Sequence, residues 1–482
     1  MSQPTQPTVA VAGGGLAGLA ASCALSDAGF RVTLFEKRPF LGGRASSWEH
    51  PSTGEVVDNC QHVLFRVCTN LIEFYQRIGV ANQIRWYDQM TFIEPGGRTS
   101  IMKSSPLPAP LHTAPSFLNF SFLSAADKFA IARALIPLTL TAQPDTGQSF
   151  QYWLDHHGQT KTAVARFWRP ILVSALSEEL DLISISAAAQ VVRESMKSPA
   201  ARQMGVPTVP LTDLYNAAGD YIRARGGELH FREPIEGFTT HDSQVQLQLR
   251  SNEGAPPLSL HSLQGQGGDF DYLILALSFE ALDKVLPESP ESAPIREQVS
   301  HFETAPITGI HLWFDRQISD LDHAVLLDRT IQWMFHKSRL QPMRTQAGNT
   351  EATGSYIELV VSSSKTLIDK SRAEIVDLAL AEVREFFPAA RSANLVKSTV
   401  IKELHATYSP RPGIDAHRPT SITAWPRVFL AGDWTATGWP ATMEGAVRSG
   451  YLAAEALACA AGFKDSHFLS PDLPASGFMR LF

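Results

Sequence analysis

Three glycines near the N-terminus have the spacing of a dinucleotide-binding turn, Gly13-x-Gly15-x-x-Gly18. The first glycine allows a tight turn, the second lets the backbone approach a pyrophosphate, and the third lets the following helix lie close to the preceding strand. The N–H groups at the start of that helix, around Leu16 and Ala17, would then face the phosphates, where the helix dipole adds attraction. These five residues therefore predict a dinucleotide site.

An acidic residue ends the segment that follows this helix. Glu36 is the last residue of RVTLFE, and Lys37 comes directly after it. A carboxylate at this place can accept hydrogen bonds from ribose hydroxyls, and it would repel a 2′-phosphate. A glycine-rich turn alone is weak evidence, because an ordinary βαβ unit can also contain one. The glycines and the acidic residue together favour a dinucleotide site that includes Glu36 and Lys37.

A strand, a helix and a second strand must position these residues. Residues 8–12 (TVAVA) are a short apolar run that predicts a buried parallel strand. The stretch 16–28 is rich in alanine and leucine and predicts a helix, and residues 31–36 predict the second strand. This order is the first part of a Rossmann-type α/β fold.

A second set of motifs occurs near the other end of the chain. Residues 427–457 begin with a strand pattern (VFLAG), continue with Asp433 in a turn, and start a helix at ATMEGAVRSG. Near the first motif, KRPFLGGRASS places two glycines and Arg44 just after the second strand. Together these stretches resemble the N- and C-terminal signatures of the FAD-dependent amine oxidase and phytoene desaturase superfamily.

This resemblance implies that the cofactor is FAD. Asp433 would bond a ribityl hydroxyl, the N-terminus of the last helix would face the flavin, and Ile235 would lie against adenine. The residues that the resemblance assigns to the cofactor, beyond those of the first motif, are Gly43, Arg44, Gln61, His62, Ile235, Gly432, Asp433, Thr442, Met443 and Ala446.

The resemblance and the chain's length also imply a division into lobes. The expected fold is α/β, with a Rossmann-type, glutathione-reductase-like FAD-binding domain built from the separate segments 1–62, 205–285 and 420–462, and an α+β substrate domain from 63–204 and 300–415, followed by a tail, 463–482. We expect 63–204 to be mainly helical and 300–415 to be mixed. The segment GGELHFREPIEGFTTHDSQVQLQLR predicts antiparallel strands, DYLILALS predicts a buried strand of the FAD sheet, and 251–269 predicts a loop.

The segment that follows the first motif supplies the candidates for catalysis. Superfamily members usually have an acidic residue in a loop beside the flavin, and Asp58 fits that position. Cys60 stands where glycine is usual, which is a departure from the superfamily pattern. Gln61 and His62 come next and are candidates for contact with flavin or substrate. We predict catalytic roles for Asp58 and His62, and the alternative for His62 is a hydrogen-bonded loop residue.

An apolar segment, 104–141, has three charged residues and four prolines that interrupt its first half. It is either ordinary core or the entrance for a large apolar substrate lying against a bilayer. We choose the part 104–125 as a membrane-binding surface, with large apolar side chains at Leu107, Leu111, Phe117, Leu118, Phe120 and Phe122.

Four segments together give a narrower resemblance: VVDNCQHVLFRVCTN, PLHTAPSFLNFSFLSAADKFAIARAL, FWRPILVSALSEELDLISISAAAQVVRESM and GDWTATGWPATMEGAVRSG. They resemble the squalene-associated FAD-dependent desaturase family, whose members act as hydroxysqualene dehydroxylases in squalene and hopanoid biosynthesis. The resemblance implies reductive removal of the hydroxyl of hydroxysqualene to give squalene, with hydride from reduced flavin. It also implies a large apolar isoprenoid substrate and upstream squalene-pathway enzymes as possible partners.

The implied chemistry places demands on the site. Loss of an allylic hydroxyl leaves a delocalised cation, which a hydride can quench from about 3–3.5 Å. Hydroxide is a poor leaving group, so an acid should protonate it, and a dry pocket should protect the cation from water. No second GxGxxG motif follows a strand, so the reductant is either a transiently docking pyridine nucleotide or another donor.

Other functions remain open at this stage. A carotenoid (phytoene-type) desaturase would use the same fold with hydride transfer in the opposite direction. An amine or protoporphyrinogen oxidase would pass electrons to oxygen, but the segment before the C-terminal motif has Trp425 and no pair of tyrosines for an aromatic cage. The alternative that is not an enzyme is a flavin-binding scaffold without catalytic activity.

Composition excludes several classes of protein. The 482 residues are 44% hydrophobic and carry a formal net charge of −7, which argues against a nucleic-acid partner. Four scattered cysteines predict neither a disulfide framework nor a zinc site, and we expect no metal. The start of the chain has no signal-peptide pattern, and no uncharged apolar run reaches 18 residues. We therefore expect a cytoplasmic enzyme that binds peripherally to the inner face of the membrane.

Overall fold

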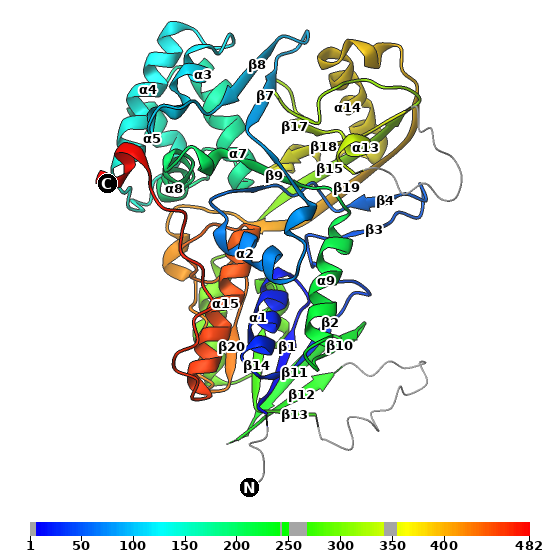
Figure 1. Cartoon of the computed structure of the whole chain (residues 1–482), viewed down its shortest axis with the longest axis vertical. Coiled ribbons are helices and arrows are strands. Elements are labelled where there is room, and N and C mark those ends of the chain that lie inside the picture. Colours follow the sequence, from blue (N-terminus) through cyan, green and yellow to red (C-terminus); the bar gives the residue numbers. More distant parts are fainter. Residues whose placement is uncertain (1–5, 242, 250–267, 342–353) are drawn as a thin grey trace.

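The structure is a computed structural model that describes residues 6–241, 243–249, 268–341 and 354–482. Two lobes are visible in Figure 1, which we name by their sheets. The parallel-sheet lobe contains the N-terminal strand together with β14, β20 and α15. The mixed-sheet lobe contains a longer sheet and most of the remaining helices, and the C-terminus lies beside these helices.

The parallel-sheet lobe is built on five strands in the order β10-β2-β1-β14-β20. Every neighbouring pair is parallel, and in the centre Val9 is paired with both Val32 and Tyr272. The strands are β1 (Thr8–Ala12), β2 (Arg31–Glu36), β10 (Glu228–Phe231), β14 (Tyr272–Leu275) and β20 (Val428–Leu430). The predicted strands 8–12 and 31–36, and the predicted return of DYLILALS to this sheet, are confirmed.

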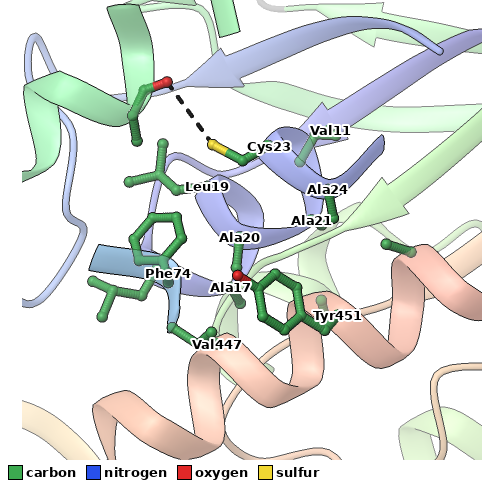
Figure 2. Packing of buried hydrophobic residues seen from close by; sticks show 14 of the residues in the cluster. Val11, Ala17, Leu19, Ala20, Ala21, Cys23, Ala24, Phe74, Val447 and Tyr451 are labelled. Atoms are coloured by element: carbon green, nitrogen blue, oxygen red, sulfur yellow. Dashed lines mark hydrogen bonds between the residues drawn. The ribbon is translucent and has the colours of Figure 1, made fainter. Parts of the chain in front are cut away.

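Helices α1 (Leu16–Asp27), α9 (Leu211–Arg223) and α15 (Met443–Ala460) cover one face of this sheet together with α2 (Thr69–Arg77). Small residues allow the close packing in Figure 2, where Ala17, Ala20 and Ala21 of α1 lie near Val447 and Tyr451 of α15. At Gly450, a Cβ atom would overlap the carbonyl of Ala17, so only glycine lets the two helices approach this closely.

The opposite face of the parallel sheet is covered by a small antiparallel sheet, β11 (Ile235–Thr240), β12 (Val245–Leu249) and β13 (Asp269–Phe270), and by α11 (Phe279–Val285) and α12 (Ala293–Ser300). The predicted antiparallel strands are confirmed for β11 and β12. For β10 the prediction was wrong, because this strand pairs in parallel with β2. The reason is that α9 precedes β10 and forms the crossover that returns the chain in the same direction. The predicted loop 251–269 falls largely outside the described residues.

The mixed-sheet lobe has seven strands in the order β19-β15-β18-β17-β16-β7-β8. They are β7 (Gln89–Ile93), β8 (Thr99–Lys103), β15 (Thr304–Phe314), β16 (His323–Leu326), β17 (Trp333–Phe335), β18 (Ser355–Ser362) and β19 (Leu395–Tyr408). The predicted strands GIHLWFD and SYIELVVS are β15 and β18, and they pair antiparallel. Helix α14 (Arg372–Phe386) packs on this sheet through Ile375, Ala379 and Val383.

A helical layer completes the mixed-sheet lobe. It consists of α3 (Ala114–Leu118), α4 (Ala125–Leu140), α5 (Phe150–His156), α6 (Lys161–Ala163), α7 (Arg169–Leu176) and α8 (Ile185–Met196). The segment 63–204 is therefore largely helical, but it also supplies β7, β8 and two strands of a small sheet, β5 (Leu64–Phe65) and β6 (Ile84–Tyr87), which pair with β9 (Met204–Pro207). The remaining elements are β3 (Ser47–Glu49), β4 (Val56–Asp58) and α13 (Lys337–Leu340).

Candidate active site

The three glycines of the first motif lie in different environments, and each position favours glycine for a different reason. Gly13 has a φ of +109° and a Cβ there would overlap the carbonyl of Ala276, while a Cβ at Gly18 would overlap the carbonyl of Gly13. Gly15 has an ordinary φ of −77°, and the nearest atom to a Cβ there is the Gly43 Cα, 3.9 Å away. The protein itself therefore leaves room at Gly15, and this room suits a pyrophosphate next to the N-terminus of α1, which begins at Leu16 and Ala17.

Glu36 lies at the end of β2 with its carboxylate fixed by two backbone donors. Its Oε2 accepts a hydrogen bond from the N–H of Gly14 (2.7 Å), and its Oε1 accepts one from the N–H of Arg38 (2.8 Å). Each oxygen keeps a further lone pair with which it could accept a ribose hydroxyl. Lys37 is exposed, whereas the side chain of Arg38 donates to the carbonyl of Gly43 (2.8 Å) and so belongs to the turn.

An ion pair joins the two motifs from opposite ends of the chain. The Arg44 Nη2 lies 2.7 Å from the Asp433 Oδ1, across 389 positions of sequence, and the Arg44 Nη1 donates to the carbonyl of Ala406 (2.8 Å). Burial lowers the pKa of Arg44, but the charge and hydrogen bond of Asp433, together with the charges of Glu280 and Glu403, outweigh burial and raise it. The predicted cofactor residues Gly43 and Arg44 are thus brought next to Asp433 and its neighbour Gly432.

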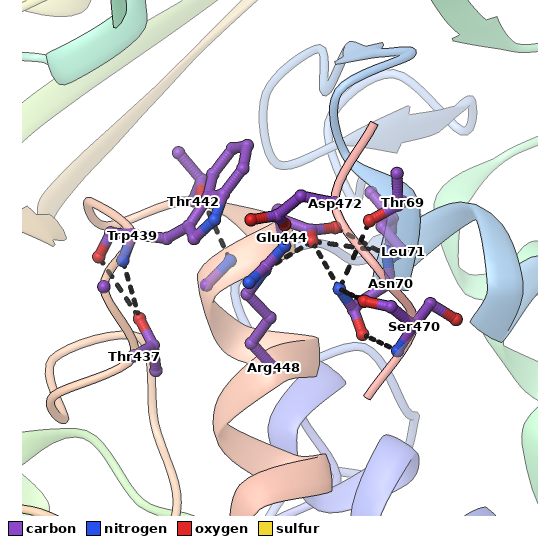
Figure 3. A network of polar contacts seen from close by, with 12 residues as sticks. Thr69, Asn70, Leu71, Thr437, Trp439, Thr442, Glu444, Arg448, Ser470 and Asp472 are labelled. Atoms are coloured by element: carbon purple, nitrogen blue, oxygen red, sulfur yellow. Dashed lines mark hydrogen bonds and ion pairs between the residues drawn. The ribbon is translucent and has the colours of Figure 1, made fainter. Parts of the chain in front are cut away.

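A polar network fixes the start of α15 against the start of α2, as Figure 3 shows. Glu444 is fully buried; its Oε1 accepts from the side chains of Asn70 (3.0 Å) and Arg448 (2.7 Å), and its Oε2 accepts from the N–H of Leu71 (2.8 Å). The N-cap residue Thr442 accepts from the N–H of Gly445. Among the predicted cofactor residues, Thr442 and Met443 line the cavity described below, Ala446 lies in the first turn of α15, and Ile235 is buried at the start of β11.

A loop of four residues, Asn59 to His62, forms one wall of this cavity. The Asn59 Nδ2 donates to the carbonyl of Arg44 (3.0 Å) and to the Glu403 Oε2 (3.2 Å). The His62 Nδ1 lies 2.7 Å from the carbonyl of Cys60. Burial lowers the pKa of His62, although this hydrogen bond partly offsets the effect. Since a carbonyl only accepts, the neutral ring carries its proton on Nδ1, and Nε2 remains an acceptor.

Asp58 lies behind this loop and not in the lining of the cavity. Its Oδ2 is 2.5 Å from the Lys337 Nζ, which also lies 2.9 Å from the Gln61 Oε1 and 3.4 Å from the Glu358 Oε2. The side chains of Asp58, Lys337 and Glu358 are all at most 2% exposed. Burial lowers the pKa of Lys337, but the two carboxylates outweigh burial and raise it. The Lys337 ammonium donates to the Gln61 side chain and is not part of the cavity lining. Asp58 therefore influences the position of Gln61 through its ion pair with Lys337.

Glu358 is the least satisfied member of this buried cluster. Neither of its oxygens has a hydrogen-bond partner among the residues that the structure describes, and the Lys337 Nζ lies 3.4 Å from its Oε2. Burial raises the pKa of Glu358 to about 7, and the charge of Asp58 adds to this while Lys337 opposes it. One ammonium thus faces two carboxylates in a dry environment, which favours a proton on Glu358 near neutral pH.

A cavity of about 700 Å³ extends from the loop Asn59–His62 into the helical layer of the mixed-sheet lobe. Its walls are mainly apolar and come from β7, α4, α7, α8 and β17. The apolar lining includes Leu71, Phe92, Phe117, Leu135, Ile136, Leu140, Phe167, Trp168, Ile171, Met196, Val325, Trp333, Phe335, Val360 and Trp439. Such a cavity suits a large ligand with little polar surface.

The apolar segment 104–125 divides into a buried and an exposed part. Phe120 and Phe122 are buried in the core of the helical layer, so their predicted place on a membrane-binding surface was wrong. The reason is aromatic packing, because both rings lie within 6 Å of Phe92 of β7. Leu107, Leu111 and Leu118 are 43%, 49% and 63% exposed, and Phe117 lines the cavity.

Several site residues were not found from the sequence. Lys337 lies in a segment with no motif, and Glu403 is one of several charged residues along β19. Glu358 had a detectable signal, since it is the one charged residue in the apolar strand SYIELVVS. A charge inside a strand that is buried throughout predicts a buried partner, here Lys337.

A dinucleotide-binding parallel sheet, completed by a distant strand and helix and adjoining a large apolar cavity, defines a flavin-dependent oxidoreductase. The chain belongs to the flavin containing amine oxidoreductase family, whose model matches residues 16–458. The cofactor is FAD, and Gly15, Arg44, Asp433 and the N-terminus of α15 are the groups that fit it. In the described part of the chain no group of side chains could bind a metal ion. None of the described helices has the length and apolar character to cross a membrane.

The relatives of the chain include carotenoid desaturases. A 15-cis-phytoene desaturase of Synechococcus elongatus is 26% identical over 93% of this chain and 95% of its own length. A probable zeta-carotene desaturase of the same organism is 27% identical over 93% and 98%. Among solved structures, wild-type putrescine oxidase bound to putrescine has a TM-score of 0.67 at 15% identity, covering 95% of this chain and 99% of that one. An oxidoreductase from Methanosarcina mazei has a TM-score of 0.67 at 16% identity, covering 92% and 98%. The structures show the shared fold.

Replacing Gly15 by valine should remove the cofactor and leave the fold intact. The structure has room for a side chain at Gly15, so the valine would occupy the place of the pyrophosphate. The purified wild type should be yellow and release non-covalent FAD on heating, and Gly15→Val should be colourless with an unchanged circular dichroism spectrum. As the matched control, Gly18→Val should fail to fold. Full FAD content in Gly15→Val would contradict this assignment.

Glu358→Gln should remove a pH dependence of stability. A carboxyl whose pKa is raised on folding stabilises the fold at low pH, and this contribution is lost as the pH rises through about 7. Between pH 5 and pH 8.5 the free energy of unfolding of the wild type should therefore fall relative to that of the variant, by about 1–3 kcal/mol. Urea unfolding at constant free FAD would measure it. The exposed control Glu297→Gln should show no such difference. If the free energies of unfolding of the wild type and Glu358→Gln differ by the same amount at every pH, the raised pKa of Glu358 is refuted.

Proposed function

We propose that the protein exchanges a hydride between FAD and an allylic carbon of a long polyprenoid chain of the C30–C40 class. The observation that carries this proposal is the mainly apolar cavity of about 700 Å³ that begins at the loop beside the cofactor residues. A small polar amine would need a charged or aromatic cage, and such a ligand would leave most of these apolar walls unfilled. FAD supplies the hydride acceptor in its oxidised state and the donor in its reduced state.

The residues of the chain would exclude water and move a proton. The apolar walls protect an allylic cation from water during hydride transfer. At the cofactor end two groups can exchange a proton with the substrate, the His62 Nε2 and the Glu403 carboxyl. Among the described residues, Asn59 is the one hydrogen-bond donor to the Glu403 carboxylate. The other carboxylates of the lining, Glu194 and Glu444, are paired with Lys197 and Arg448.

One candidate reaction is the reductive dehydroxylation of hydroxysqualene to squalene. The protonated hydroxyl leaves as water, and a hydride from reduced FAD takes its place on the same carbon, so that an external reductant must restore the reduced cofactor. The four sequence segments that resemble squalene-associated desaturases support this candidate. Glu403 is the group that would supply the proton, because the neutral His62 is a poor acid.

The second candidate is desaturation of a carotenoid precursor, in which the substrate loses a hydride and a proton and an external acceptor reoxidises FAD. The phytoene and zeta-carotene desaturases among the relatives support it. The neutral His62 with an acceptor Nε2 also supports it, because the reaction needs a base next to the substrate. The comparisons favour this candidate, whereas the sequence segments favour dehydroxylation.

One assay would distinguish the two reactions. The FAD-loaded protein is incubated anaerobically with hydroxysqualene and a reductant that carries deuterium to the flavin, and in parallel with phytoene and a quinone. Dehydroxylation predicts squalene with deuterium on the carbon that lost oxygen. Desaturation predicts a new conjugated double bond that is visible by absorbance. Turnover of neither lipid, with turnover of a small amine, would contradict the polyprenoid assignment.

We also propose that the protein is a cytoplasmic enzyme that binds peripherally to the inner face of the membrane, where it would meet upstream enzymes of its pathway. Exposed apolar side chains lie on the segment 104–125, on α4 and on the C-terminal turn. The N–H of Phe478 in the C-terminal turn donates to the carbonyl of Ala109, and the side chain of Lys128 in α4 donates to the carbonyl of Leu118. This surface comprises Leu107, Leu111, Leu118, Phe129, Ile136, Phe478, Leu481 and Phe482. Leu111 and Ile136 also line the cavity, so the surface adjoins its mouth.

Replacing Leu111 and Leu118 together by aspartate should abolish binding to liposomes. Each large apolar side chain that enters the acyl region contributes about 1.5–3 kcal/mol, so the loss of two should weaken binding at least tenfold. Flotation with anionic liposomes would measure binding, and FAD absorbance would report the fold. Ile422→Asp, at a similarly exposed position of the parallel-sheet lobe, is the control and should float like the wild type. Unchanged flotation of the double variant would contradict the membrane surface.

A further inference from the structure

The cavity contains a cation that the proposed function does not use. Arg202 ends the short turn Ala200–Arg202, just before β9, and lines the cavity beside Met102 and Ala201. The same part of the wall includes Leu111, Thr113 and Met196, so Arg202 lies where the cavity approaches the segment 104–125. The other arginine of the lining, Arg44, differs because it is paired with Asp433.

The charge of Arg202 is not balanced by the described residues. Its guanidinium contacts the thioether sulfur of Met102, which is a weak acceptor, and no described carboxylate lies within ion-pair distance. Burial alone lowers the pKa of Arg202 to about 10, so the side chain is still charged at neutral pH. A partly buried guanidinium without an anionic partner is unfavourable in an apolar cavity unless a ligand supplies acceptors.

A second polar side chain beside it also lacks a partner. His112 is fully buried, and neither of its ring nitrogens has a hydrogen-bond partner. Burial lowers the pKa of His112 to about 4, and the positive charge of Arg202 contributes, so the ring is neutral and offers one N–H donor. Its neighbours Leu111 and Thr113 both line the cavity. Arg202 therefore presents to the cavity a charge that no described carboxylate balances, and the neutral His112, which is not a lining residue, adds no negative charge near it.

We propose that Arg202 binds the carboxylate or phosphate head group of a long-chain amphiphile whose apolar chain occupies the cavity. A guanidinium matches both anions in geometry, and its five donors can bind two oxygens at once. A neutral polyprenoid hydrocarbon has no atom that could accept these hydrogen bonds. The inference therefore goes beyond the proposed function and does not depend on it: an anionic lipid is a second class of ligand for the same cavity and would compete with an uncharged substrate.

Binding of two matched amphiphiles to the FAD-loaded protein would test this proposal. Dodecyl phosphate and 1-dodecanol share a chain and differ in charge, and both are used below the concentration of micelle formation. The wild type should bind dodecyl phosphate at least about tenfold more tightly, because hydrogen bonds to a charged group strengthen the complex. In Arg202→Met this preference should disappear while binding of 1-dodecanol is retained. Arg202→Lys, which keeps the charge but not the planar fork, should retain part of the preference.

Controls separate the head-group site from a general effect of charge or folding. Arg169→Met removes a partly exposed arginine that is paired with Glu179 outside the cavity lining, and it should bind both amphiphiles like the wild type. FAD absorbance and circular dichroism verify each variant. Equal affinity of the wild type for both amphiphiles would overturn the proposal even if Arg202→Met fails to fold. Displacement of dodecyl phosphate by equimolar inorganic phosphate would also overturn it, because the site would then recognise the ion without its chain.

Discussion

The ion pair between Arg44 and Asp433 is the contact on which the cofactor site depends. It joins the turn after β2 to the turn after β20. Both turns lie at the carboxyl end of the parallel sheet, although β1 and β14 lie between the two strands. Parallel strands bring their carboxyl ends to one edge, and the ion pair closes that edge around the place of the flavin. Helices α1 and α15 start close to these turns, and they pack against each other at Gly450.

The site separates charge from apolar surface. The polar groups gather behind and beside the loop Asn59–His62, where Lys337 fixes Gln61 and Glu444 fixes the start of α2. Beyond the loop, toward the helical layer, the walls are mainly apolar. In the proposed reaction, this separation would let one cavity bind a hydrocarbon chain while the groups that exchange protons remain at the cofactor end. Glu194 and Arg202 are exceptions, and Arg202 differs from Glu194 because no described residue of opposite charge is paired with it.

Local motifs predicted the cofactor half of the structure well and the rest incompletely. The strands 8–12 and 31–36 and the last helix follow from short patterns, because a dinucleotide turn demands specific residues at specific distances. The direction of β10 was wrong, since strand direction depends on the crossover made by α9 and not on the composition of the strand. The predicted catalytic residue Asp58 lies behind the loop, because its partner Lys337 comes from a segment 279 positions away that carries no motif. The predicted place of Phe120 and Phe122 on a membrane-binding surface was wrong, because an apolar run has the same composition in a protein core and on a membrane-binding surface.

The last strand and helix of the parallel sheet come from residues 428–460, after every strand of the mixed sheet. During synthesis the strands β1 and β2 emerge first, but the edge strand β20 and helix α15 are made only after the mixed-sheet strands. Sheets that need such distant pairings fold slowly and leave an unpaired edge exposed in the meantime. The newly made chain therefore cannot complete its cofactor site until the strands of the mixed-sheet lobe have been made, and these strands are already available for folding by then. Cofactor capture in this way follows the synthesis of the mixed-sheet lobe.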